Sequence, residues 1–498
     1  MADRVAGRRM AHCVREDKER MEVFIGLDIG TSKLSAVALD AAGELVATVF
    51  RTNDADVSGL PPGHHEQAPR RIWELALDLL AELGRALAEV GGHVRALGLT
   101  GQMHGVLLAD EALEPMTNLV TWQDRRAVEA GPDGAPFIVE FAERAGERAL
   151  RDTGSRPATG YAAAALYWMD RSGRTPEGAR WALTVHDWVA ARLAGAGPVT
   201  DPTDAASTGL YNVRQGRWDE RLLEAAGVPD ALMPPVQEAG TAVGSVAHDL
   251  AAATGLGTEA LVCTALGDCQ AASLAALREP ENEVVLNIGT GGQVGAVTGR
   301  FLHGPDLDVR PFPGGRLLSV GASLSGGAGF MYLAVHYARA IESIAGARVP
   351  LRDVLDALTG QARGVPPGAD GLLVDPLFTG RRSDPALRGS IFGMSPSNNT
   401  PGHWARAFME GLVDELHGYY QEMLDAGLAA RGRLVGAGNG MRLNEVLREA
   451  AQRAFDMPLA VALWKEEAAC GAALAAMVGA GALDGFAEAA GLVRHGPE

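Results

Sequence analysis

Alternating apolar and polar runs near the start of the chain predict a β-hairpin followed by a third strand. Residues 23–28 form an apolar run, the polar turn Gly30-Thr31-Ser32 follows, and a second apolar run covers residues 34–39. The turn at residues 40–43 then leads into a third apolar run at residues 45–50. Short apolar runs separated by glycine-containing polar turns are typical of strands joined in hairpins.

Two longer segments repeat their apolar residues at helical spacing. In residues 71–90 these are Ile72, Leu75, Leu79, Leu80, Leu83, Leu87 and Val90, and in residues 404–424 they are Trp404, Phe408, Leu412, Leu416, Tyr420 and Met423. Side chains three and four positions apart lie on one face of a helix, so both segments are predicted to be amphipathic helices. Strands that alternate with such helices indicate an α/β fold.

The first strand and its turn have a counterpart later in the chain. Leu27-Asp-Ile-Gly-Thr31 matches Leu286-Asn-Ile-Gly-Thr290 at an offset of 287 − 28 = 259 residues, which is about half of the 498-residue chain. A repeat on this scale indicates two related domains that face each other. Two such loops would make a clamp for a polyphosphate.

The repeat divides the chain into an N-terminal domain at residues 21–250 and a C-terminal domain at residues 251–498, with the boundary in the turn-rich stretch 234–257. Residues 1–20 are rich in arginine and lysine and have no apolar core. We therefore expect them to form a disordered tail rather than a secretory signal, with Met21 as an alternative start.

The net charge of −18 argues against nucleic acid or an anionic membrane as a partner. No apolar run has the length of a membrane-spanning helix. The four cysteines form no CxxC pair, which favours free thiols in a reducing compartment and hence a cytoplasmic location. In so acidic a protein, a phosphate site must create its own attraction from backbone N–H groups, a lysine or a metal ion.

The first loop has the composition of a phosphate site. The glycine at position 30 lets backbone N–H groups approach an anion, and Thr31, Ser32 and Lys33 add further donors. Asp28 at the strand end could place Mg²⁺. The same residues are common in an ordinary tight turn, but the repeat at Gly289-Thr290 favours function. GxxxxGK[ST] does not occur, so this is not a P-loop enzyme.

A second candidate is Asp268, which follows the apolar run 260–266 and precedes an alanine-rich segment. A carboxylate between a strand end and a helix start could accept a hydroxyl proton during phosphoryl transfer. The alternative, an ordinary helix N-cap, is about twice as common for a lone aspartate.

Two further segments have the composition of a polyol pocket. Gln102, Met103 and His104 follow the predicted strand 95–99, and Trp122, Gln123 and Asp124 come soon after. An indole face stacks on the C–H surface of a sugar, while amide, imidazole and carboxylate groups bind its hydroxyls. Taken singly, a loop histidine or a buried tryptophan is usually structural.

A glycine-rich turn with Gly436, Gly438 and Asn439 joins a predicted strand to a helix from about residue 442. Such a turn lets the backbone approach the adenosine of a nucleotide, although turns of this kind are frequent in proteins.

In this order, these motifs resemble the FGGY carbohydrate kinases over residues 22–480. The resemblance rests on residues 28–33, Glu66-Gln67, 102–105, 122–126, Asp268, 287–291, the turn 323–327, 384–393, Glu410-Gly411, 436–439 and 471–474. It implies a two-domain ribonuclease-H-like, actin-like fold with the ligand cleft between the domains. The N-terminal domain would then bind the sugar and the C-terminal domain the nucleotide.

Within the family, Gly101–Val106, Leu119–Asp124, His186-Asp187 and Gly267–Gln270 look most similar to the sedoheptulokinases. Cys269 stands where many members have an amide that can touch the sugar, which makes xylulose and glycerol less suitable acceptors.

The resemblance implies that Thr31, Ser32, Lys33, Gly289, Thr290, Gly327, Gly436, Gly438 and Asn439 bind ATP, and that Asp28 and Asp268 hold Mg²⁺. The partners would be a sugar and ATP, with a homodimer as one option. D-xylulokinase is the alternative within the family. From other classes, an actin-like assembly ATPase or a non-catalytic sugar sensor stays open.

Overall fold

The structure is a computed structural model that describes residues 21–289, 291–323, 326–378, 380–381, 383–384 and 386–496. The predicted tail at residues 1–20 and the predicted nucleotide-binding residue Thr290 lie outside the described residues.

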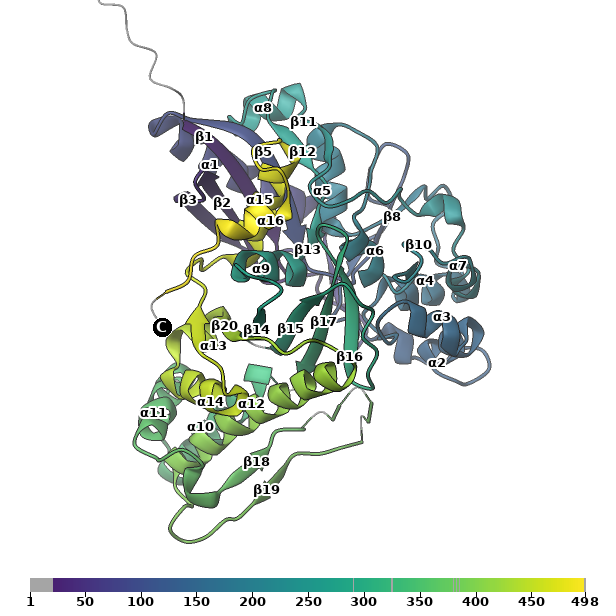
Figure 1. The fold of residues 1–498 in the computed structure, drawn as a ribbon. Coiled ribbons are helices and arrows are strands. Elements are labelled where there is room, and N and C mark those ends of the chain that lie inside the picture. Colours follow the sequence, from purple (N-terminus) through teal and green to yellow (C-terminus); the bar gives the residue numbers. More distant parts are fainter. Residues whose placement is uncertain are drawn as a thin grey trace, which may run out of the picture.

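Two mixed β-sheets form the two halves of the molecule (Figure 1). The first sheet has the order β11 (Ala242–Ser245), β12 (Leu261–Cys263), β5 (Gly92–Gly101), β1 (Met21–Ile29), β2 (Lys33–Asp40) and β3 (Leu45–Thr52), and β13 (Leu266–Gly267) also pairs with β5. The second has the order β16 (Leu307–Phe312), β17 (Arg316–Ser323), β15 (Gly292–Thr298), β14 (Glu283–Ile288), β20 (Arg433–Ala437) and β21 (Leu459–Val461). The first sheet uses residues on both sides of the predicted boundary.

The two sheets repeat one topology. In the first, β1 pairs antiparallel with β2 and parallel with β5. In the second, β14 pairs antiparallel with β15 and parallel with β20. The predicted repeat of residues 27–31 at residues 286–290 therefore begins at equivalent strand ends, and the described part of each copy confirms an α/β fold built from two related halves.

Helices cover the outer face of each sheet. On the first sheet these are α1 (Pro69–Glu89), α5 (Val185–Ala194) and α8 (His248–Thr254). On the second they are α10 (Gly326–Ala345), α11 (Leu351–Arg363), α12 (Pro401–Asp425) and α14 (Glu445–Phe455), which follows the short α13 (Gly438–Leu443). The apolar stripes predicted for residues 71–90 and 404–424 lie in α1 and α12 and are mostly buried.

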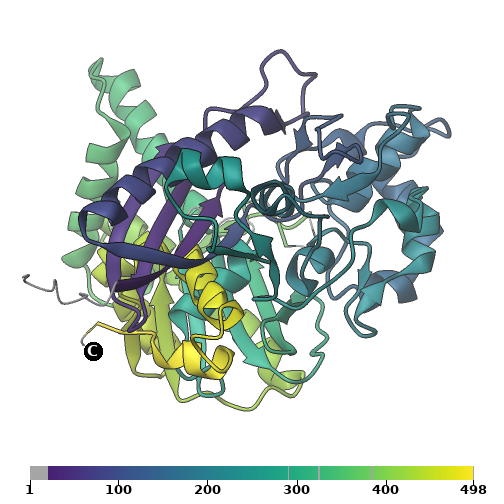
Figure 2. The same ribbon diagram turned by 90° about the horizontal axis from the view of Figure 1, so that it is seen from above.

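A separate helical unit extends from the first half, most clearly in the view from above (Figure 2). It contains α2 (Phe137–Ala145), α3 (Glu147–Asp152), α4 (Ala162–Arg171) and α7 (Glu220–Ala226) around its own apolar core. The short helix α6 (Pro202–Ser207) and the strand pairs β4 (Glu66–Gln67) with β7 (Leu119–Val120), β6 (Leu107–Ala109) with β8 (Trp181–Leu183), and β9 (Tyr211–Asn212) with β10 (Arg217–Trp218) connect it to the sheet. The hairpin of β18 (Leu373–Asp375) and β19 (Ser390–Phe392) extends from the second half (Figure 1).

Two helices pack between the sheets and join the halves. Helix α9 (Asp268–Ala276) and helix α15 (Glu467–Gly479), which is followed by α16 (Phe486–Gly491), share one apolar cluster with strands of both sheets. Helix α15 lies so close to β1 that a Cβ atom on Gly26 would overlap the carbonyl oxygen of Ala469. Glycine is therefore required at this position, and the contact fixes α15 and its neighbour α9 against the strand ends.

Candidate functional site

The carboxyl ends of three strands of the first sheet meet at one point. Asp28 of β1 is the register partner of Thr100 on β5, and Thr100 is in turn the partner of Leu266 on β13. Asp268 follows β13 directly and is the first residue of α9. The sheet therefore brings Asp28 and Asp268 together, although they are 240 residues apart in the chain (268 − 28).

The N-cap interpretation of Asp268 does not hold in the structure. The cap position of α9 is Gly267, and no side chain makes the capping hydrogen bond. Instead, the N–H of Gly267 donates to the hydroxyl of Thr203 at 2.8 Å, and this hydroxyl donates to Asp201 at 2.7 Å. Asp268 is thus the first residue of the helix and not its cap.

Both carboxylates hold their protons more tightly than usual. Burial, and next the charge of Asp268, raise the pKa of Asp28 to about 8, against the lowering effect of Lys33. Burial also raises the pKa of Asp268, while the backbone N–H of Cys269 and the charges of His186 and Arg310 oppose this. Two carboxyl groups that repel each other in a partly dry site make a place for a cation.

The carboxylates of Asp28 and Asp268 are suitable ligands for Mg²⁺, but they are too few to coordinate a metal ion without water or substrate. The described residues contain no group of three or more His, Cys, Asp or Glu side chains arranged for metal binding. Mg²⁺ is commonly bound by one or two carboxylates together with water and substrate phosphates. Asp28 and Asp268 are a pair of this kind.

A chain of hydrogen bonds connects the first loop to the predicted sugar-binding residues. The hydroxyl of Thr31 accepts a hydrogen bond from the indole of Trp122 at 2.9 Å and donates to Gln102 at 3.2 Å. The amide of Gln102 donates to Gln67 at 2.8 Å, and the amide of Gln67 returns to the backbone oxygen of Thr31 at 2.9 Å. The structure thus brings together Thr31, Gln102 and Trp122, which sequence reasoning had placed in two separate groups.

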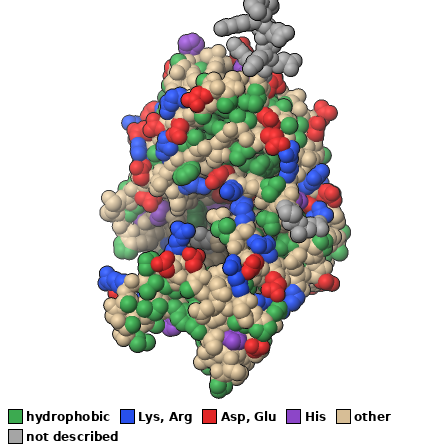
Figure 3. Space-filling model, turned by 90° about the vertical axis from the view of Figure 1, so that its left-hand side faces the viewer, with side chains coloured by type: hydrophobic (Ala, Val, Ile, Leu, Met, Phe, Trp, Pro, Cys, Tyr) green, Lys and Arg blue, Asp and Glu red, His purple; other side chains and the backbone are tan. Residues whose placement is uncertain are grey.

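The other donors of the first loop point to solvent. The Ser32 side chain is exposed. The Lys33 ammonium, which is also exposed, forms an ion pair with Glu466 at 2.7 Å, just before α15. Figure 3 draws one face of the molecule and shows a hollow between its upper and lower parts, with acidic and basic side chains around it.

His104 is held in a strained conformation beside the site. Its φ of +74° lies in the left-handed region, which is uncommon for a residue other than glycine. Its ring contacts the backbone oxygen of Ser207 at 2.8 Å and stacks on Tyr161 with a centroid separation of 4.1 Å. The side chain of Met103 is buried beneath the turn at Gly267. Strain of this kind is often found at binding sites.

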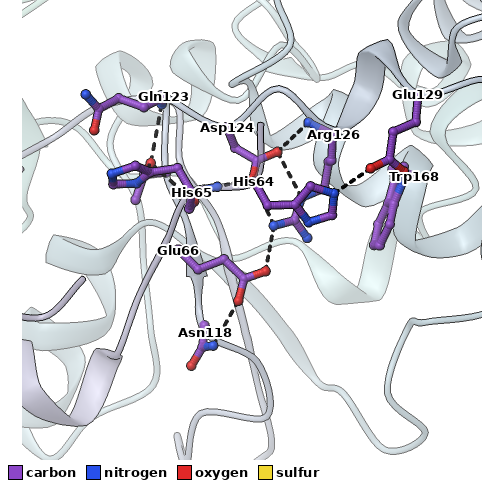
Figure 4. Close-up of polar contacts among 10 residues, drawn as sticks. His64, His65, Glu66, Asn118, Gln123, Asp124, Arg126, Glu129 and Trp168 are labelled. Carbon is purple, nitrogen blue, oxygen red and sulfur yellow. Dashed lines mark hydrogen bonds and ion pairs between the residues drawn. The ribbon is translucent and has the colours of Figure 1, made fainter. Parts of the chain in front are cut away.

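Among the residues predicted at 122–124, Trp122 and Gln123 are exposed and Asp124 is buried. Figure 4 shows how the Asp124 carboxylate is used. It accepts from the backbone N–H of His65 at 2.7 Å and from Arg126 at 2.8–2.9 Å, and Arg126 also contacts Glu66 at 2.6 Å. These contacts fix the turn that presents Trp122, and direct contact of Asp124 with a sugar stays a prediction.

The glycine-rich motifs of the second half also meet at strand ends. Asn287 of β14 is the register partner of Ala437 on β20. Gly438 follows with φ +77°, and a Cβ atom there would lie 2.5 Å from the side-chain oxygen of Asn287 and 2.7 Å from the carbonyl oxygen of Ile288. Its N–H donates to Glu467 at the start of α15, at 2.9 Å. Gly436 lies in β20 itself and Asn439 lies in α13, which begins at Gly438, so the predicted glycine-rich turn before a helix from about residue 442 is instead a direct junction of strand and helix.

A mostly apolar cavity of about 200 Å³ opens beside this turn. The glycines in its lining include the predicted Gly289 and Gly327 together with Gly440. Its walls come from Phe330, Met331, Leu355, Phe408, Met409, Leu412 and Leu447, among others. A flat apolar group such as an aromatic base suits a cavity of this kind, whose glycine edges allow close approach of the backbone.

Sequence reasoning missed several residues that the fold brings to the site. The sequence motifs assign no role to Gln67, Tyr161, Ser207 or Arg310. Arg310 lies on β16, in the other half of the molecule, and nothing in its local sequence distinguishes it from a surface arginine. These side chains reach the site through long-range contacts, which periodicity and spacing do not show.

Within the described residues, no helix combines the length and the apolar character needed to cross a membrane.

Two halves of one sheet topology that meet at the strand ends beside Asp28 and Asp268 are the architecture of the actin-like carbohydrate kinases. The chain belongs to the FGGY family of carbohydrate kinases: the model of the N-terminal domain matches residues 23–275 and that of the C-terminal domain residues 287–480.

Relatives that are named as kinases of different acceptors match most of the chain. It is 29% identical to the sedoheptulokinase of Mus musculus, over 91% of this chain and 96% of that protein. It is 31% identical to the glycerol kinase of Thermus brockianus, over 93% and 91%. The crystal structure of xylulose kinase from Rhodospirillum rubrum superimposes with a TM-score of 0.83 at 25% identity, covering 95% of this chain and 93% of that one. The comparisons therefore define the family and leave the acceptor open.

Proposed function

We propose that this sugar kinase transfers the γ-phosphoryl group of ATP to the terminal hydroxyl of a neutral ketose, with sedoheptulose as the first candidate acceptor and sedoheptulose 7-phosphate as its product. The observation that carries the proposal is the position of Asp268. Its carboxylate lies beside Asp28, at the strand ends from which the Thr31–Gln102–Trp122 chain begins.

Asp268 is the proposed general base. The terminal hydroxyl of the sugar gives its proton to this carboxylate as the oxygen attacks the γ-phosphorus and the bond to the departing ADP breaks. A raised pKa suits this task, because a base whose pKa lies nearer neutrality takes up a proton more readily. The exposed indole of Trp122 offers a stacking face to the sugar, and Gln102 and His104 offer polar atoms nearby.

ATP would lie between the two halves. Thr31, Ser32 and Lys33 would bind the phosphates, and Lys33 can exchange its exposed ion pair with Glu466 for a phosphate oxygen. The cavity beside Gly289 and Gly440 would take the adenine. Thr290 stays a predicted phosphate ligand.

Asp28 and Asp268 are the residues that would hold Mg²⁺. The bound ion would neutralise charge on the phosphates during transfer. It would also relieve the mutual repulsion of the two carboxylates.

Two features support sedoheptulose over the alternative acceptor D-xylulose. Residues 101–106 and 119–124 are similar to the sedoheptulokinase pattern, and Cys269 replaces the amide that many members of the family have beside the base, since a thiol is a weaker hydrogen-bonding group. The three cysteines in the described part of the chain are free thiols, which supports a reducing compartment such as the cytoplasm.

The test is release of ADP from MgATP in the presence of sedoheptulose, D-xylulose, D-ribulose, L-ribulose or glycerol. A preference for sedoheptulose supports the full proposal. A preference for D-xylulose keeps the mechanism and replaces the acceptor. Absence of sugar-dependent ADP release across a wide panel would transfer support to the assembly ATPase or the sugar sensor.

The role of Asp268 has its own test. Asp268→Asn should lower kcat by about 10³-fold or more and leave sugar binding largely intact, because the amide cannot accept the hydroxyl proton. Asp249→Asn is the matched control, since Asp249 also lies in the first turn of its helix but is exposed on α8. Full turnover by Asp268→Asn would refute the assignment of the base.

A further inference from the structure

A buried arginine reaches the proposed acceptor site from the opposite half of the molecule. Arg310 lies on β16, at the edge of the second sheet, and only 7% of it is exposed. Strand β16 extends across to the first half, where the N–H of Val309 donates to the backbone oxygen of Gly154 at 2.6 Å. The strand also packs against α6, the helix that contains Ser207. Arg310 is therefore placed at the junction of the halves.

The neighbours of Arg310 are the groups that surround the proposed base. Its guanidinium donates to Asp308 at 2.8 Å. Burial raises the pKa of the Cys269 thiol, and Arg310 opposes this through its charge and a side-chain hydrogen bond. The charge of Arg310 also acts on Asp268 and on the phenol of Tyr161, the ring that stacks on His104. Together with the contact between β16 and α6, these interactions place Arg310 in the neighbourhood of the proposed base.

An ordinary structural ion pair explains this arrangement poorly. The register partners of Asp308 and Arg310 on β17 are the apolar residues Val320 and Leu318. Replacing a buried ion pair by well-packed apolar side chains is often neutral or stabilising, so stability alone gives little reason for a charged pair here. A guanidinium has five N–H donors in a planar fork, and one carboxylate accepts only part of them.

We propose that Arg310 determines specificity in the acceptor site by donating hydrogen bonds from its guanidinium to hydroxyl oxygens of a neutral polyhydroxy substrate held against Asp268. This inference rests on the proposed kinase function. Asp308 balances the arginine charge, which favours a neutral acceptor over an aldonate. The neighbouring Cys269 has a small thiol that donates weakly, so Arg310 supplies the donors at this end of the pocket.

The proposed sugar contacts come from both halves of the molecule, which bears on domain closure. Gln102, His104 and Trp122 come from the first half of the chain, whereas Arg310 comes from the second. A sugar that contacts both sets connects the two halves directly. Sugar binding would then favour the closed arrangement in which ATP and the acceptor are aligned.

The test compares Arg310→Met with Arg316→Met. Arg316 lies on the neighbouring strand β17, pairs with Glu281 and is partly exposed, so it controls for the loss of an arginine from this sheet edge. For Arg310→Met we expect the KM of the preferred sugar and its calorimetric Kd to rise about 10- to 100-fold, as for lost hydrogen bonds to a charged donor. The KM of ATP should stay within about twofold, and Arg316→Met should match the wild type in both constants.

Three results would overturn the inference. One is a fall in kcat with an unchanged Kd for sugar, which would give Arg310 a role in the transition state alone. Another is an unchanged Kd together with lower stability, which would make the ion pair structural. The third is a wild-type preference for gluconate over neutral sugars. If Arg310→Met does not fold, Arg310→Lys keeps the charge without the fork, and an unchanged sugar Kd in that variant would count against the inference.

Failure of the kinase proposal can be distinguished from failure of this one. If the wild type releases no ADP with any sugar, the kinase proposal fails. Contact between Arg310 and a sugar is then measured from the rise in melting temperature that each sugar causes. A rise in the wild type that Arg310→Met loses and Arg316→Met keeps would support the contact, and its presence in all three proteins, or its absence from the wild type, would refute it.

Discussion

Substituting Gly438 by alanine tests whether the glycine-rich turn of the second half binds the nucleotide. Gly438 has a φ of +77°, where an alanine is strained by roughly 1–2 kcal/mol. The added Cβ would also lie 2.5 Å from the Asn287 side-chain oxygen and 2.7 Å from the Ile288 carbonyl oxygen. The Asn287 side chain can rotate away, but the carbonyl belongs to β14 and cannot move without shifting the strand end.

The second contact sets the size of the expected effect. Overpacking of a well-packed site costs about 1–3 kcal/mol, so the total loss of stability should be about 2–5 kcal/mol. The strand end that must move is followed by Gly289, which lines the apolar cavity together with Gly440. If about 1.4 kcal/mol of the strain is expressed in nucleotide binding, the affinity for ATP falls tenfold.

Gly315 provides the matched control. It has φ +69° in the turn between β16 and β17, and a Cβ atom there would meet nothing within 4 Å. Gly315→Ala should therefore show the conformational cost alone, with an unchanged KM for ATP. Urea unfolding gives the stability of both variants, and initial rates at varied ATP and saturating sugar give the KM. Equal stability and equal KM for the two variants would refute the argument from the strand end.

Three further predictions address other parts of the site. Gly160→Ala should raise the KM of the sugar and leave the KM of ATP nearly unchanged, because the new Cβ would overlap the backbone oxygen of Trp122. An unaltered KM of the sugar would refute a role for the Trp122 turn in the acceptor site. Lys33→Met should raise the KM of ATP but change the unfolding free energy by less than about 1 kcal/mol, since its ion pair with Glu466 is exposed; urea unfolding and ATP kinetics measure both. Burial, and next the charge of Asp204, raise the pKa of Asp187 to about 7, so the folded protein binds this proton more tightly than the unfolded chain does. The wild type should therefore lose stability as the pH rises from about 4 through about 7, by up to about 4 kcal/mol, and Asp187→Asn should not. Equal dependence of the unfolding free energy on pH in the two proteins would contradict this.

The elements predicted from local pattern agree with the structure where the pattern is long. The apolar runs at residues 23–28 and 34–39 lie in β1 and β2, and the helical spacing of residues 71–90 lies in α1. Each of these signals depends on neighbours within a few residues, so the sequence carries it directly. Residues 260–266 were predicted to form one strand, but the structure has the short strands β12 and β13 with a break at residues 264–265. The break lets the chain turn towards α9, and strand pairing with β5 sets it.

The site was predictable to the extent that its residues lie in motifs. Asp28, Thr31 and Gln102 lie at strand ends, where glycine and polar residues interrupt apolar runs. The surroundings that give them their properties come from elsewhere in the chain: burial, and next the charge of Asp268, raise the pKa of Asp28, and Gln67 accepts a hydrogen bond from Gln102. Such pairings require the fold, because residues far apart in the chain become neighbours only through sheet register.

The hydrogen bond from Trp122 to Thr31 connects the proposed sugar site to the proposed phosphate loop. An exposed indole is usually mobile, but here its N–H is held by the hydroxyl of a residue in the proposed phosphate loop. A sugar stacked on Trp122 would restrain the indole and, through Thr31, the loop backbone that receives ATP. Order gained when one substrate binds lowers the entropic cost of binding the other. Binding of sugar and nucleotide should therefore be mutually favourable, and Thr31→Val should reduce that coupling more than it reduces the affinity for either substrate alone.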